Sequence, residues 1–130
     1  MCGKRLLQKS LLKLNTYSIQ NLCSQLNQFF NRFWTDFYAE WQIIDEEVDE
    51  DTRFNMLDDF YHIYQDQFLT DYAPTSPAED IAESWTFFLL APKPEPNSIA
   101  NEKILFFYEY PELLEVRAQI LDRICVEFQQ

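Results

Sequence analysis

Three carboxylates cluster within residues 79–83 of the chain, and a tyrosine precedes them at position 72. Glu79, Asp80 and Glu83 follow a Ser-Pro pair, which is typical of a helix start, and Tyr72 precedes them in a loop. Paired carboxylates act as acid and base in glycosidases. A hydrolase could therefore be built on these three acids. Nothing in the sequence, however, places a second carboxylate opposite them across a cleft.

Histidine is the next residue type to consider, because zinc enzymes of the HExxH class take two ligands and a general base from one helix. The chain has one histidine, His62, with no Glu after it and no His four residues later. Catalytic zinc sites use three protein ligands. The chain therefore cannot form a complete catalytic zinc site. Because His62 lies among aromatic residues, its alternative role is that of a satisfied or surface histidine.

Residues 68–85 read FLTDYAPTSPAEDIAESW and resemble the second zinc-binding motif of gluzincin-type metallopeptidases. The likeness is greatest to the anthrax lethal-factor-like and bacterial zinc-binding peptidase families. In those families a Tyr and a short loop precede Glu-Asp-Phe-Ala-Glu-Ser-Phe at a helix start. Here Ile81 and Trp85 replace the two Phe residues, and Ser76-Pro77 stands where Asn is common. The resemblance extends loosely to Arg117.

The resemblance implies a role for each of three residues. Glu79 would be the third zinc ligand, and Glu83 would orient a ligand histidine. Tyr72 would donate its hydroxyl to the oxyanion. In these families the cofactor is zinc, the substrate is a peptide or protein, and the HExxH helix lies upstream of the motif. We therefore predict a truncated or degenerate metallopeptidase-like domain that neither binds zinc nor catalyses hydrolysis by itself.

Glu79 and Tyr72 also have structural interpretations. Ser76 and Glu79 have the spacing of a capping box, in which each side chain accepts a hydrogen bond from the other residue's backbone amide. With no histidines nearby, capping is the interpretation favoured for this chain. Tyr72 could equally be a loop tyrosine packed on the domain.

Charge limits the choice of partners. The formal net charge is −12; residues 1–35 contain five basic residues and no acid, whereas residues 36–130 contain all 22 acids. Such an acidic body repels phosphate backbones, which argues against nucleic-acid binding. The acidic run at 45–51 lacks the turn glycine of a calcium loop and is interpreted as a solvated helix end and loop. The alternative function is therefore an acidic helical interaction module that binds a protein partner without metal.

The hydrophobic pattern predicts an all-α fold of about five helices in one domain, residues 16–130. Gly3 is the only glycine, which disfavours a fold with many tight turns. Apolar steps of three and four predict a long helix from Thr16 to about Ile44. A second helix starts at Asp51 or Thr52 and points Phe54, Leu57, Phe60, Tyr61, Tyr64 and Phe68 inward. Further helices are expected at 76–89, at 98–110 and from Pro111, with a Pro-rich connector near 91–97.

The remaining features concern the compartment. Residues 1–15 form a basic segment, expected to be disordered, that faintly suggests a transit peptide or a short basic helix. No run approaches the roughly 20 apolar residues of a membrane span, and no convincing signal peptide is present. The three scattered cysteines argue against a disulfide framework. We expect a cytoplasmic protein.

Overall fold

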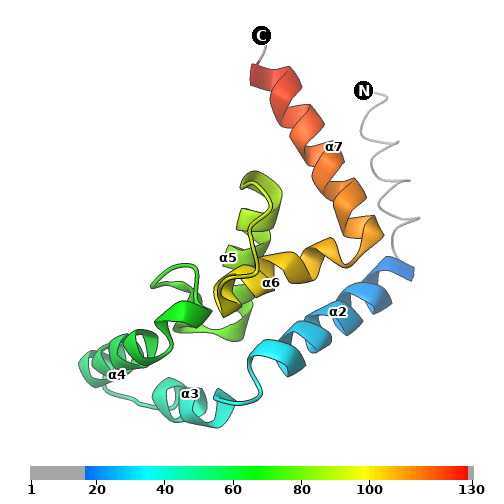
Figure 1. Cartoon of the computed structure of the whole chain (residues 1–130). Coiled ribbons are helices and arrows are strands. Elements are labelled where there is room, and N and C mark those ends of the chain that lie inside the picture. Colours follow the sequence, from blue (N-terminus) through cyan, green and yellow to red (C-terminus); the bar gives the residue numbers. More distant parts are fainter. Residues whose placement is uncertain (1–16, 129–130) are drawn as a thin grey trace, which may run out of the picture.

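The computed structural model describes the backbone of residues 17–128 and the side chains of residues 21–125. The basic segment 1–15 lies outside the described residues. Within them the chain forms six α-helices, two 3-10 helices and no strand, so the all-α prediction is confirmed (Figure 1). The elements are α2 (Tyr17–Phe33), α3 (Tyr38–Asp45), α4 (Glu50–Ile63), η1 (Gln65–Gln67), η2 (Ala73–Thr75), α5 (Pro77–Leu90), α6 (Ile99–Tyr108) and α7 (Pro111–Phe128).

The predicted helix from Thr16 to about Ile44 is divided in two. Residues 34–37 form a turn between α2 and α3. In this turn the Trp34 indole reaches across to Asp80, and the Phe37 ring packs on Phe60 at a centroid distance of 5.3 Å. Both side chains are almost fully buried. At the bend the chain leaves the regular helix, and the two side chains contact residues that are distant in sequence. A local hydrophobic period does not predict such contacts.

The helix α4 begins at Glu50, one or two residues before the predicted start at Asp51 or Thr52. The Asp49 side chain caps it by accepting a hydrogen bond from the Thr52 amide at 2.9 Å. Phe54 was expected to point inward, and this prediction is wrong because its side chain is 70% exposed. Phe60 and Phe68 are buried as expected, although Phe68 follows η1 rather than belonging to the helix. Phe54 instead lines an open cleft between α3, α4 and η2.

The later helix boundaries follow local signals. Pro77 and Pro111 begin α5 and α7, and residues 91–98 form an irregular connector. Ser76 accepts a hydrogen bond from the Glu79 amide at 3.1 Å. Ser98 accepts one from the Asn101 amide, also at 3.1 Å. These predicted helix starts are confirmed. The first of them marks the point at which the segment 68–85 changes from loop to helix.

Aromatic side chains make up most of the core. Phe29 of α2 packs against Phe106 and Phe107 of α6 at centroid distances of 5.5 and 5.9 Å. This contact joins the N-terminal helices to the C-terminal ones. Figure 1 shows α7 extending away from the other helices, opposite the end formed by α3 and α4. Within residues 17–128 no helix is both long and apolar enough to cross a bilayer.

Candidate functional site

Hydrogen bonds between side chains and the backbone fix the loop before α5. Thr70 accepts a hydrogen bond from the Ala73 amide at 3.2 Å, and the Thr75 hydroxyl donates to the Tyr72 carbonyl at 2.6 Å. The Trp41 indole donates to the Pro74 carbonyl at 3.0 Å. The loop that carries Tyr72 is therefore fixed both locally and by α3.

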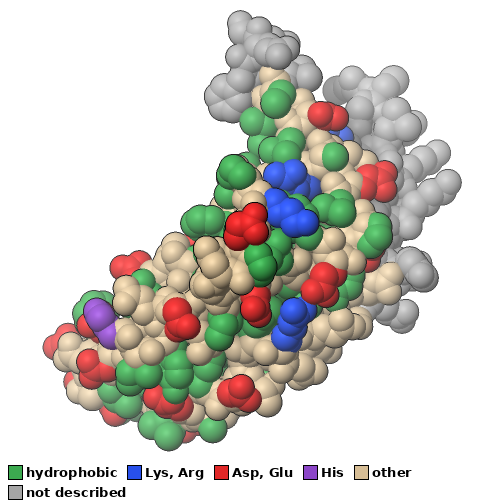
Figure 2. All heavy atoms as spheres, in the orientation of Figure 1, with side chains coloured by type: hydrophobic (Ala, Val, Ile, Leu, Met, Phe, Trp, Pro, Cys, Tyr) green, Lys and Arg blue, Asp and Glu red, His purple; other side chains and the backbone are tan. Residues whose placement is uncertain are grey.

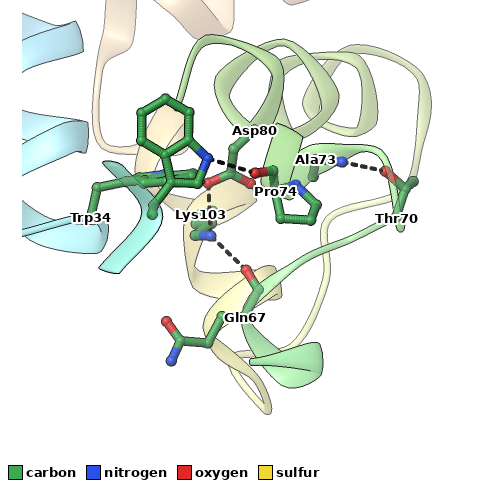
Figure 3. A network of polar contacts seen from close by, with 8 residues as sticks. Trp34, Gln67, Thr70, Ala73, Pro74, Asp80 and Lys103 are labelled. Carbon is green, nitrogen blue, oxygen red and sulfur yellow. Dashed lines mark hydrogen bonds and ion pairs between the residues drawn. The ribbon is translucent and has the colours of Figure 1, made fainter. Parts of the chain in front are cut away.

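A buried ion pair lies behind this loop. One carboxylate oxygen of Asp80, Oδ2, accepts from Lys103 Nζ at 2.7 Å and from the Trp34 indole at 2.8 Å. Lys103 also donates to the Gln67 carbonyl and lies 4.2 Å from the centre of the Phe68 ring. Figure 3 shows that these groups come from separate elements and converge behind the loop. The Asp80–Lys103 pair therefore ties the turn between α2 and α3 to α5, α6 and η1.

Burial dominates the electrostatics of this pair. Neither side chain has any exposed surface. Loss of water raises the pKa of Asp80, and the Lys103 charge and hydrogen bond only partly oppose this. Burial likewise lowers the pKa of Lys103 against the attraction of Asp80. The second Asp80 oxygen, Oδ1, and the Ser84 hydroxyl have no hydrogen-bond partner among the described residues. Burying these two charges in the interior therefore costs free energy.

The three residues singled out by the resemblance lie at two places. Glu79 and Glu83 are half-buried and lie one turn apart on α5. Tyr72 is 53% exposed and lines a cleft of about 720 Å³ between α3, α4 and η2. The cap bond from the Glu79 amide to Ser76 is present, whereas the reciprocal bond of a capping box does not form. The carboxylate of Glu79 makes no hydrogen bond with any described residue.

His62 occupies an exposed position on α4. Its Nδ1 lies 2.7 Å from the Asp58 carbonyl oxygen and 3.5 Å from the Asp58 carboxylate. Figure 2 shows this histidine at the α4 end of the surface, with acidic side chains scattered over the face rather than gathered in one patch. Among the described side chains, no three His, Cys, Asp or Glu residues are grouped to hold a metal ion. The exposed thiols of Cys23 and Cys125 belong to α2 and α7.

An apolar groove runs between α2 and α5, with a volume of about 360 Å³. We call it the α2–α5 groove. The α2 wall consists of Leu22, Gln25, Leu26 and Phe29. The α5 wall consists of Ala78, Ile81, Ala82 and Trp85. Phe106 and Phe107 of α6 and Leu113 of α7 complete the lining. Leu22 and Leu26 remain 49% and 37% exposed, so apolar surface stays open to solvent.

Sequence reasoning missed both the buried pair and the groove. The local signal for Asp80 is its spacing, because it lies two turns before the apolar Phe88 on the same face of α5. Neither Lys103 nor Trp34 carries any local signal of a charged partner.

Comparison of the chain with models of protein families, with curated proteins and with solved structures finds no match.

Proposed function

We propose that the chain is a helical protein-interaction domain that binds a helix of a partner in the α2–α5 groove. The observation that carries this proposal is the groove itself, an open channel whose lining is apolar apart from Gln25. Exposed apolar surface bounded by polar residues is typical of binding sites in soluble proteins. Three core residues, Phe29, Phe106 and Phe107, line the groove, so this surface lies next to the core.

The shape of the groove favours a helix as its occupant. Both walls are helical faces whose lining residues recur at i, i+3, i+4 and i+7, the spacing of an ordinary helix–helix contact. Ala78 and Ala82 are small and exposed, so another backbone can approach α5 closely. Helix-in-groove recognition uses such a channel to receive apolar anchors at the same spacing.

The test uses the full chain and a synthetic amphipathic helix of about 15 residues, long enough for some helicity in water. The peptide carries leucine at i, i+3, i+4 and i+7 and otherwise neutral glutamine and alanine. We expect saturable binding that changes the fluorescence of Trp85, a groove-lining residue. Ala82→Gln should weaken binding, because it places a bulky polar side chain in the channel.

Ala39→Gln on the exposed face of α3 provides the matched control, since it makes the same change away from the groove. This variant should bind like the unmodified chain. Equal binding by the Ala82→Gln and Ala39→Gln variants would refute the groove as the site, as would no binding of the peptide by the unmodified chain.

A second candidate function is a metallopeptidase-like domain that supplies one zinc ligand. It is favoured by α5, where Glu79 lies in the first turn with its carboxylate free of described partners and Glu83 follows one turn later. Zinc would supply Lewis-acid activation of water. The described residues do not fit this ion by themselves, because only one suitably placed carboxylate is present and three protein ligands are needed.

The test of this candidate is zinc uptake. The full chain alone should retain far less than one equivalent of zinc after dialysis. Addition of a helical peptide carrying HExxH should raise the retained zinc, and Glu79→Gln should abolish that rise while Glu46→Gln leaves it unchanged. Retention that is the same for both variants would remove Glu79 as a ligand.

A further inference from the structure

We infer that the partner helix of the α2–α5 groove is basic, with lysine or arginine flanking its apolar face. This inference rests on the proposed function and specifies the chemistry of the partner. The supporting observation is charge complementarity: the margins of the groove are acidic, and a basic helix would match them.

Carboxylates lie along the groove on two sides. Glu79 and Glu83 each follow a groove-lining alanine in α5, so a turn of about 100° per residue places both along one margin. On the other side, the exposed Glu112 of α7 accepts a hydrogen bond at 2.8 Å from Gln25, a lining residue. Three acids therefore border a channel that is otherwise apolar.

Three basic side chains of the described helices are engaged elsewhere. Arg32 pairs with Glu109 at 2.8 Å, and Arg117 donates to the Phe88 carbonyl at 2.7 Å. Lys103 is buried against Asp80. Among the described residues, neither Glu79, Glu83 nor Glu112 forms an ion pair with a basic side chain. Their charges are therefore left for a partner to neutralise.

A basic amphipathic helix fits this arrangement. Its apolar face would enter the channel, while the long stems of lysine or arginine lie over the groove edge and bring their charges to the margin carboxylates. Such rim pairs contribute little individually, but they select the sign of the partner's charge. The same acids would repel an acidic helix, and the net charge of −12 reinforces this selection over longer range.

The experiment compares three peptides with one leucine face and with lysine, glutamine or glutamate at the flanking positions. Each is titrated into the full chain at low salt. The lysine peptide should bind about tenfold more tightly than the glutamine peptide, as a few exposed ion pairs would give. The glutamate peptide should bind more weakly than both. At about 1 M salt the lysine and glutamine peptides should converge.

Two double variants of equal net charge separate local pairing from general attraction. Glu79→Gln with Glu83→Gln should remove most of the lysine preference. Glu46→Gln with Glu95→Gln, at exposed positions just after α3 and in the connector, should preserve it. Equal loss in both variants would overturn the inference, because attraction by the whole surface would then account for the preference.

The outcomes also separate this inference from the proposed function. Tight binding of all three peptides, weakened by Ala82→Gln, would uphold the groove and overturn the basic partner. Binding of the lysine peptide that Ala82→Gln leaves unchanged would overturn both, because the peptide would then lie outside the groove.

Discussion

Asp80 and Lys103 show how one residue pair can organise a chain this short. Their charges meet where four elements converge, and the Trp34 indole gives Asp80 a second donor. Such a pair need not be more stable than an apolar substitute, because withdrawing two charges from water is costly. Removal of one member alone is worse, since it leaves the other buried and unpaired. The pair thus specifies how α5 and α6 meet.

Removing one charge of the buried pair should destabilise the fold more than removing both. Lys103→Met should lower the free energy of unfolding by about 3–5 kcal/mol, because Asp80 then loses its counter-charge in the interior. Adding Asp80→Asn should recover much of that loss, since the amide oxygen can still accept from Trp34. Urea unfolding of the two variants measures both values. If the double variant is less stable than Lys103→Met alone, the two residues are not coupled as the structure indicates.

The pH dependence of the Lys103→Met variant follows from the same geometry. Burial raises the pKa of Asp80, and loss of the lysine should raise it further. A carboxyl whose folded pKa lies above its unfolded pKa stabilises the fold below the unfolded value of 3.8, and this contribution is lost as pH rises through the folded pKa. The penalty of Lys103→Met should therefore be largest at pH 7 and shrink toward pH 4. Unfolding measured at several pH values tests this, and a penalty independent of pH would contradict it.

At the scale of elements, local chemistry explains most helix boundaries but not the bend. Ser76-Pro77, Ser98 and Pro111 mark helix starts because a cap or a fixed φ acts within a few residues. The turn at 34–37 depends on the Phe60 ring and the Asp80 carboxylate, which are distant in sequence, so periodicity predicted one helix where two form. The sequence pattern did not predict the α2–α5 groove either. It depends on which faces of α2 and α5 remain uncovered.

The side chain of Ser76 caps the start of α5, and its contribution to stability can be measured. Ser76→Ala should cost about 0.5–2 kcal/mol of stability, because the Glu79 amide loses its acceptor at the start of α5. Glu79→Gln should change stability little, since the Glu79 side chain does not return a bond to Ser76. Thermal unfolding of both variants, with Ser98→Ala as a second cap at α6, gives the comparison. A larger loss for Glu79→Gln than for Ser76→Ala would show that the Glu79 carboxylate stabilises the fold.

For the whole molecule, composition was a good guide to the fold and a poor one to the site. A chain with one glycine, 12 Phe and recurrent three-and-four spacing has few alternatives to packed helices, and that prediction is confirmed. The motif around Glu79 and Tyr72 was found from sequence, but the arrangement of its residues was not. Tyr72 lines the cleft between α3, α4 and η2, whereas both glutamates belong to α5. The loop between them is held by the Trp41 indole, a contact 33 residues distant in sequence.

The position of the core gives the last prediction. Phe29 is fully buried where α2 meets α6, whereas Phe54 on α4 is 70% exposed. Phe29→Ala should therefore lower the free energy of unfolding by about 3–5 kcal/mol, the usual cost of emptying a buried aromatic position. Phe54→Ala makes the same chemical change and should cost no more than about 0.5 kcal/mol, as surface substitutions do. Urea unfolding followed by circular dichroism compares the two variants directly. Equal losses would mean that α4 packs through the face that the sequence pattern first indicated, and that the uncovered side of this helix is part of the core.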